Sequence, residues 1–328
     1  MSKRILTTII ALSTITACTE PNVLPSWNDT PLKAQIIDYV ENAAQVIPVE
    51  DRIAVFDMDG TIACEQPLWF EMAVAVQKMV DKQEADPSLR EITEYQYAVK
   101  LSENPRDTSV LNNWFTDGHN YLESILVNAF DGVESEEYIE YARNFLNSAR
   151  VWNGKKYSEL FYQPMIELID YLKEHEFDVY IVSGSTQGVV WSICPQEIGF
   201  DRKHLIGSKL ETTVSFKEGE KAQFILHNEF AKPKNNYYGK SVNIYNQIGK
   251  IPVIAIGNTV GDFGMFRLAS SSPHPNFVMM LNHDDKEREL AYPPYYTGEE
   301  VYQWEDSLKV HGWHKANMSE EFKVVWKK

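Results

Sequence analysis

The stretch RIAVFDMDGT, residues 52–61, decides the fold of this chain. Its first five residues are mostly apolar, which predicts a strand buried on both faces. Two carboxyl side chains, Asp57 and Asp59, follow directly at positions i and i+2, so both point toward one place beyond the strand end. Gly60 allows a tight turn there. Carboxylates this close together either take different proton-transfer roles or bind a cation.

Strand and helix patterns alternate outward from this segment. Residues 164–174 have apolar side chains at helical spacing, and a hairpin is expected around residues 217–220. Further buried strands are predicted at 177–182, 205–210, 252–256 and 277–281. The alternation predicts an α/β fold with a parallel sheet flanked by helices.

About a hundred residues between the first strand and the helix at 164–174 contain no convincing strand. Helical patterns run through residues 68–80 and 134–147. Both ends of this region return to the same sheet, so we interpret residues 67–155 as a helical insertion that covers the strand ends.

Three more segments carry polar residues where a strand ends or a helix begins. Ser183 and Gly184 end the strand VYIV at 179–182, and Lys240 lies in YGKSV at 238–242. Asn258 and Asp262 follow the strand at 252–256 in the segment IAIGNTVGD. Each segment alone is compatible with an ordinary turn or a solvated lysine, but the four together predict one polar site.

These four segments resemble, in order, the motifs of the haloacid dehalogenase superfamily, over about residues 50–290. The resemblance implies a Rossmann-like core formed by residues 19–66 and 156–328. The insertion at 67–155 is similar to the helical, C1-type cap of the phosphoserine phosphatase-like branch.

The resemblance also implies roles for individual residues. Asp57 would be the nucleophile that forms an aspartyl-phosphate, and Asp59 the general acid and then the general base. Ser183, Gly184 and Lys240 would bind the phosphoryl group.

A magnesium site is implied as well, with Asp57, Asp59 through its carbonyl, Asn258 and Asp262 as ligands or close supports. The family usually has Asp where this chain has Asn258. An amide oxygen can bind Mg²⁺ but contributes no charge, which puts the metal affinity in doubt.

Together these features predict a magnesium-dependent phosphomonoester hydrolase. Dehalogenases lack a second acid because a halide leaving group needs no proton, and pump ATPases need transmembrane helices. Asn258 favours one alternative, a tethered phosphoester-binding protein without turnover; a purely structural lipoprotein is a third interpretation.

The substrate is the least defined part of the prediction. Glu65 and Trp69 lead from the first motif into the insertion, and an acid beside aromatic rings suits an amine or quaternary ammonium group. Phosphoserine, phosphoethanolamine and phosphocholine would fit; the alternative is that Trp69 and Phe70 belong to the core of the cap. The charged segment from His283 to Glu289 resembles one in secreted members of the branch. A solvated, charged helix start is the alternative interpretation of this segment. His311 and His314 are interpreted as surface residues.

Composition excludes one class of partner. The chain has 328 residues, 31 basic and 47 acidic side chains and a formal charge of −16. No cluster of Lys and Arg suited to nucleic acid is present. Cys64 and Cys194 remain after the N-terminal region, and they are expected to be buried thiols or a disulfide.

The first 18 residues are predicted to be a lipoprotein signal peptide. Lys3 and Arg4 precede a short apolar stretch that ends in ITAC, which resembles a bacterial lipobox. Cys18 would then be lipidated, and Thr19 resembles the following residue of outer-membrane lipoproteins. The chain is therefore expected in the cell envelope, facing the periplasm and attached to the membrane only through its N-terminal lipid; an ordinary cleaved signal peptide is the alternative.

We expect Cys18→Ala to release the protein from the membrane fraction, or to stall its processing, in a Gram-negative host. The substitution removes the only thiol that the lipobox interpretation modifies. Fractionation and gel migration check this, and a variant that behaves like the wild-type protein in both would exclude lipidation at Cys18.

Overall fold

Six strands form the central sheet, in the order β10-β9-β8-β1-β4-β5. The computed structural model describes residues 23–111, 113, 115–116, 118–216, 221–293 and 304–327. All neighbouring strands run parallel, which confirms the predicted α/β fold. The strands are β1 (Ile53–Phe56), β4 (Asp178–Thr186), β5 (Leu205–Ser208), β8 (Ile254–Gly257), β9 (Phe277–Asn282) and β10 (His314–Asn317).

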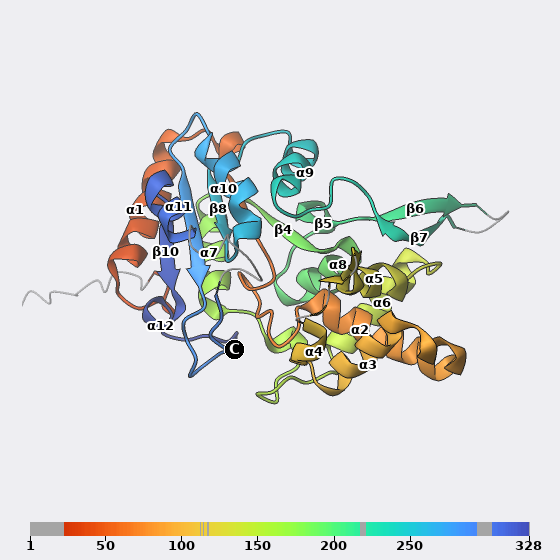
Figure 1. Ribbon diagram of the computed structural model, residues 1–328. Coiled ribbons are helices and arrows are strands. Elements are labelled where there is room, and N and C mark those ends of the chain that lie inside the picture. The colour runs from red at the N-terminus through yellow and green to blue at the C-terminus, as the bar shows by residue number, and fades with distance from the viewer. Residues whose placement is uncertain are drawn as a thin grey trace, which may run out of the picture.

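Helices cover both faces of this sheet (Figure 1). Ala54 and Phe56 of β1 belong to one core cluster, whereas Ile53 and Val55 point to the other face and belong to a second cluster. Because β1 is buried on both sides, its sequence is a continuous apolar run. The first cluster includes side chains of α1 (Pro31–Val46), α7 (Gln163–Glu174) and α8 (Gln187–Glu197), and the second includes side chains of α9 (Tyr238–Ile248), α10 (Phe263–Ser270) and α11 (Trp304–His311).

Helices dominate the predicted insertion at residues 67–155, and Figure 1 shows them together to one side of the sheet. They are α2 (Phe70–Ala85), α3 (Thr93–Glu103), α4 (Thr108–Leu111), α5 (Tyr121–Ala129) and α6 (Ser135–Leu146). The region also contains a two-stranded ribbon of β2 (Phe115–Thr116) and β3 (His119–Asn120), which the sequence pattern did not indicate. We refer to residues 67–155 as the cap; its exact boundaries stay a prediction.

An antiparallel hairpin joins the cap to the core. Its strands are β6 (Leu210–Ser215) and β7 (Gln223–Phe230), on either side of the predicted turn at 217–220, which lies outside the described residues. The Leu226 N–H donates to the Val133 carbonyl at 2.9 Å, and the Gly132 N–H donates to the Leu226 carbonyl at 2.9 Å. The cap is therefore hydrogen-bonded to a second segment of the core, in addition to its two covalent connections.

Strand β10 is the one strand of the central sheet that the sequence pattern missed. Its residues, His314 to Asn317, include no apolar run, and it pairs with β9 at the edge of the sheet. His314 stacks on Phe277, with ring centroids 4.3 Å apart, and His311 stacks on Trp313 at 4.6 Å. His311 is exposed as predicted, whereas His314 is partly buried against Phe277, so the prediction of a surface residue was wrong for His314.

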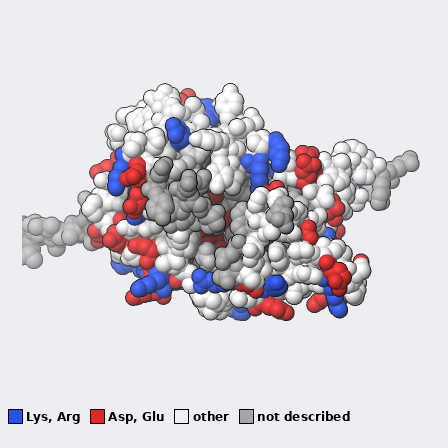
Figure 2. Space-filling model, in the orientation of Figure 1, with Lys and Arg blue, Asp and Glu red and all other residues white. Residues whose placement is uncertain are grey.

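The described part of the chain adds two findings on cysteines and membranes. Cys64 and Cys194 are buried free thiols. Among the described helices, none has both the length and the apolar character needed to cross a membrane. On the face drawn in Figure 2, the described Lys and Arg side chains are scattered among Asp and Glu and form no continuous basic surface.

Trp27 fastens the two ends of the described chain to each other. It is 1% exposed, its indole N–H donates to the Pro164 carbonyl at 2.8 Å, and its ring meets that of Phe322 edge-on at 5.2 Å. Next to Trp27, the Asn28 N–H donates a backbone hydrogen bond to the Glu321 carbonyl, and the Lys323 N–H donates one to the Ser26 carbonyl. The terminal segments thus complete one apolar core.

We expect Trp27→Ala to lower the free energy of unfolding by about 3–5 kcal/mol, because it leaves a large cavity and an unpaired carbonyl. Trp152→Ala is the matched control, since Trp152 is 45% exposed and its loss should change stability by less than about 0.5 kcal/mol. Urea unfolding followed by circular dichroism measures both values. Equal effects of the two substitutions would contradict this account of the core.

Candidate active site

The predicted motifs converge at the carboxyl edge of the sheet, where the chain order of the strands reverses. Strand β1 lies between β4 and β8, so the chain moves to one side after β1 and returns to the other side for β8. Asp57 follows β1, Asn258 follows β8, and Ser183 lies in the last part of β4. Open α/β sheets bind ligands at such a reversal.

Lys240, on the first turn of α9, connects two carboxylates at the centre of the site. Its Nζ lies 2.5 Å from Asp57 Oδ1 and 2.6 Å from Asp262 Oδ1, and its side chain is buried. Burial lowers the pKa of Lys240, but Asp262 and Asp57 outweigh it and hold this pKa above its ordinary value. Helix α9 therefore supplies a permanent positive charge next to Asp57.

Asp57 is in an environment that disfavours its charged form. Burial, followed by the negative charge of Asp262, raises its pKa well above the ordinary value; Asp59 adds to this and Lys240 opposes it. A carboxylate that must be ionised here needs further positive charge nearby. A divalent cation beside Asp57 would supply it.

Asp59 is held by hydroxyl groups instead of an ammonium group. Ser183 and Ser185 donate to Asp59 Oδ2 at 3.1 and 2.8 Å, and the Ser185 N–H donates to Ser183 Oγ at 3.0 Å. Loss of hydration raises the pKa of Asp59, and these hydroxyl groups and the Phe70 N–H oppose the shift. Ser185 was not among the predicted site residues, although its spacing of two from Ser183 indicates the same face of a strand.

Two buried side chains hydrogen-bond to the backbone carbonyls of Ser183 and Gly184. Ser208 Oγ donates to the Gly184 carbonyl at 2.7 Å, and Asn235 Nδ2 donates to the Ser183 carbonyl at 2.7 Å. Both supporting side chains are fully buried. The phosphate-binding role of Ser183, Gly184 and Lys240 stays a prediction, but buried hydrogen bonds hold the backbone at Ser183 and Gly184 in place.

Asp262 holds the loop after β8. Its Oδ2 accepts the N–H groups of Asn258 and Thr259 at 3.0 Å each, while its Oδ1 accepts from Lys240. Both oxygens are therefore engaged by the protein, which favours the supporting role for Asp262 over direct metal ligation.

The side-chain amide of Asn258 contacts a different residue through each of its two polar atoms. Its Nδ2 donates to Glu65 Oε1 at 3.0 Å, and its Oδ1 lies 3.4 Å from Thr61 Oγ1. Thr61 Oγ1 is also 3.4 Å from Asp57 Oδ2, so oxygens of Asn258 and Asp57 face the same hydroxyl group. Gly60 has a φ of +74°, and a Cβ at this position would lie 1.9 Å from Asn258 Nδ2. Only glycine therefore fits in the turn beside the Asn258 amide.

These donors fit a hard divalent cation. Asp57 Oδ2, Asn258 Oδ1 and the predicted Asp59 carbonyl are oxygen ligands of the kind that Mg²⁺ prefers. In the described part of the chain, no group of three or more His, Cys, Asp or Glu side chains is arranged to hold a metal by itself. The predicted set therefore depends on the amide oxygen of Asn258 and on a backbone oxygen.

The two predicted substrate residues lie at the boundary between core and cap. Glu65 is buried against Asn258, one of the predicted metal ligands, and Trp69 is partly buried against the large core cluster. Sequence reasoning missed Glu71, in the first turn of α2. Burial raises the pKa of Glu71 to about 7, with Asp59 adding to the shift, and its carboxylate accepts the Thr186 N–H at 3.1 Å.

The segment after β9 has a structural role that its sequence did not reveal. His283 Nε2 lies 2.6 Å from the Gly60 carbonyl, and its Nδ1 lies 2.8 Å from Glu289 Oε2, whose other oxygen accepts from the Tyr162 hydroxyl. Burial lowers the pKa of His283, but Glu289 outweighs it, so this pKa is raised overall. The Tyr292 ring stacks on the imidazole at 4.3 Å. His283 thus holds the turn that carries Asp59 and Gly60.

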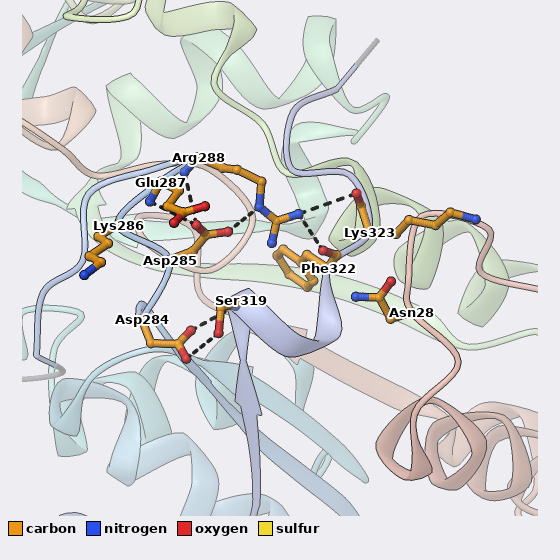
Figure 3. A pocket seen from close by; sticks show the side chains of 9 residues that line it. All are labelled: Asn28, Asp284, Asp285, Lys286, Glu287, Arg288, Ser319, Phe322 and Lys323. Atoms are coloured by element: carbon orange, nitrogen blue, oxygen red, sulfur yellow. Dashed lines mark hydrogen bonds and ion pairs between the residues drawn. The ribbon is translucent and has the colours of Figure 1, made fainter.

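The neighbouring acids, Asp284 and Asp285, line an open pocket of about 490 Å³ (Figure 3). Ser319 donates to Asp284 through its N–H and its hydroxyl, at 2.9 and 2.7 Å, while Arg288 pairs with Asp285 and donates to the Phe322 carbonyl. These bonds tie the segment to the end of the chain. No residue predicted for catalysis lines this pocket.

Similar folds occur in solved structures. A conserved functionally unknown protein from Anaerococcus prevotii superposes with a TM-score of 0.50 at 15% identity, over 82% of this chain and 96% of that one. A protein with unknown function from Bordetella pertussis gives 0.50 at 12% identity, over 81% and 97%. At this identity the likeness concerns the fold alone. A search of curated proteins gave no significant match.

The family comparison agrees with the motifs. The haloacid dehalogenase-like hydrolase family matches residues 54–267, more than half of the chain. The match begins in β1, directly before Asp57, and extends past Asp262, so it spans all four motif segments. With Asp57, Asp59, Lys240 and the loop after β8 gathered at one edge of the sheet, the chain belongs to the haloacid dehalogenase-like hydrolase family.

Proposed function

We propose that the protein is a magnesium-dependent phosphomonoester hydrolase that forms an aspartyl-phosphate on Asp57. One observation carries this proposal: Asp57 and Asp59 are two residues apart, yet an ammonium group holds the first and two hydroxyl groups hold the second. Carboxyl groups kept in different environments are suited to different chemical roles.

In the first step, an oxygen of Asp57 attacks phosphorus and the bond from phosphorus to the ester oxygen breaks. Asp59 gives its proton to that oxygen, so the alcohol leaves neutral. The raised pKa of Asp59 favours the protonated form that this step requires. Lys240, Ser183 and the backbone at Gly184 bind the phosphoryl oxygens.

In the second step, water attacks the phosphorus of the aspartyl-phosphate. Asp59, now ionised, takes the proton from this water, and inorganic phosphate and free Asp57 result. A halide leaving group would not need the acid, so an acid held by Ser183 and Ser185 favours phosphate ester hydrolysis over dehalogenation.

Asp57, the Asp59 carbonyl and Asn258 would hold Mg²⁺, and Asp262 would support their loop. When bound, the ion supplies positive charge that keeps Asp57 ionised and offsets charge on the phosphoryl group. A phosphoester-binding protein without turnover is the second candidate, because Asn258 removes one negative charge from the predicted metal site.

We further propose a small phosphoester substrate outside the cytoplasm, with phosphoserine, phosphoethanolamine and phosphocholine as the first compounds to test. Glu71, a buried acid at the boundary of core and cap, supports an amine-bearing group. The proposed lipid anchor at Cys18 would place the enzyme in the periplasm, at the outer membrane.

We expect the wild-type protein to release phosphate from p-nitrophenyl phosphate with Mg²⁺ and to lose this activity with EDTA. Asp57→Asn removes the nucleophile and should leave less than a tenth of the rate. The control is Asp38→Asn on the exposed side of α1, which should keep full activity. Activity that persists with EDTA would exclude the metal, and an Asp57→Asn variant that keeps a tenth of the rate or more would exclude Asp57 as the nucleophile.

Asp59→Asn tests the second acid. An aryl ester has a good leaving group, so it needs little acid help in the first step, whereas water still needs a base in the second. We therefore expect turnover to fall about 10²–10⁴-fold and the phosphorylated protein to accumulate. Acid quenching followed by intact mass spectrometry detects this species. If Asp59→Asn turns over normally, Asp59 has no proton-transfer role.

A further inference from the structure

The residue pair Glu65 and Asn258 occupies the edge of the predicted metal site. Both side chains are buried, 5% and 1% exposed, and Glu65 Oε1 accepts from Asn258 Nδ2 at 3.0 Å. Asn258 stands where the resemblance leads one to expect a carboxylate. The acid next to it comes from the segment between β1 and α2, 193 positions earlier in the chain.

This contact fixes the orientation of the amide. An ionised carboxylate only accepts hydrogen bonds, so the NH₂ of Asn258 must face Glu65. The amide oxygen then points the other way, toward the Thr61 hydroxyl that Asp57 Oδ2 also faces. Glu65 thus turns the single oxygen of Asn258 toward the other predicted ligand.

The same contact explains why aspartate would suit this position less well. A carboxylate at position 258 could not donate to Glu65, and two negative charges about 3 Å apart in a buried site repel strongly. The absence of a side chain at Gly60 makes room for this pair, because a Cβ there would lie 1.9 Å from Asn258 Nδ2 and 2.8 Å from Glu65 Oε1. Asparagine and glutamate together give the site one negative charge and one internal hydrogen bond.

We propose that Glu65 is a positioning residue of the divalent-cation site: it orients the Asn258 oxygen and provides the negative charge that asparagine lacks. The proposal rests on the magnesium site of the proposed function. It gives Glu65 a role on the metal side of the reaction, in place of contact with the substrate amine.

A double-mutant cycle tests this, with Mg²⁺ binding to the purified protein measured by calorimetry. Glu65→Gln should weaken binding about 10-fold or more, the usual effect of losing a group that orients a metal ligand. Asn258→Asp alone should change the Kd by less than about threefold, because repulsion from Glu65 offsets the added charge.

The combined variant, Glu65→Gln with Asn258→Asp, is the decisive one. The glutamine NH₂ can donate to the new carboxylate, so the pair regains its hydrogen bond and its single charge with the roles exchanged. We expect its Kd to return to within about threefold of wild type. Glu321→Gln is the control, since Glu321 is a buried acid outside the four motif segments, where it accepts from the Thr30 hydroxyl, and it should leave the Kd unchanged.

Two outcomes would overturn the proposal: Glu65→Gln with a Kd within twofold of wild type, or a combined variant that binds no better than Glu65→Gln. A Glu65→Gln variant that raises KM only for phosphoserine and not for p-nitrophenyl phosphate, at unchanged Mg²⁺ affinity, would assign Glu65 to the substrate instead. The gain in Tm on adding Mg²⁺ gives a second reading of affinity for each folded variant.

Failure of the proposed function looks different. A wild-type protein that neither binds Mg²⁺ nor hydrolyses phosphate esters would remove the site and this proposal together. A wild-type protein that does both, beside a Glu65→Gln variant with normal Mg²⁺ affinity, would remove only the role of Glu65.

Discussion

The ammonium group of Lys240 lies between Asp57 and Asp262, and three separate parts of the chain meet there: the end of β1, the start of α9 and the loop after β8. Each carboxylate would be costly to bury without this partner. Removing one member of a buried ion pair typically costs about 3–5 kcal/mol, because the remaining charge is left uncompensated. The ionic contact therefore sets the positions of Asp57 and of the β8 loop relative to each other.

Around this contact, each of the other polar side chains of the site has its own hydrogen-bond partner. The hydroxyl groups of Ser183 and Ser185 hold Asp59, the two N–H groups after β8 hold Asp262, and Glu65 holds the amide of Asn258. Parallel strands bring these supports to one edge, because every strand of the sheet delivers its carboxyl end there. A reaction that needs several fixed oxygen atoms can then be served by residues far apart in the sequence.

Much of this arrangement could be predicted from local patterns. Apolar runs gave five of the strands, among them β1 and β8, and the polar residues directly after them gave Asp57, Ser183 and Asn258. Strand β10 was missed because HKAN contains no apolar run and pairs only at the edge of the sheet.

Contacts between distant residues could not be read from the sequence. His283 meets the Gly60 carbonyl across 223 positions and Glu65 meets Asn258 across 193, and neither side chain belongs to a periodic pattern. Glu65 was predicted to line the substrate pocket because it leads toward the cap, and its contact with Asn258 was not foreseen. Its actual neighbour depends on the turn at Gly60, whose geometry only the folded chain defines.

The hairpin of β6 and β7 bears on how the cap can move. A cap joined to the core only by two covalent linkers could rotate about them as a hinge. Here the backbone bonds of Leu226 with Gly132 and Val133 attach the cap to the hairpin, whose own two strands return to the core. The two linkers and the two hairpin strands then all restrain the cap, and the contact between the Tyr138 and Thr186 hydroxyl groups adds a further restraint. The cap cannot swing away from the core as a unit unless these hydrogen bonds break or the hairpin moves with it.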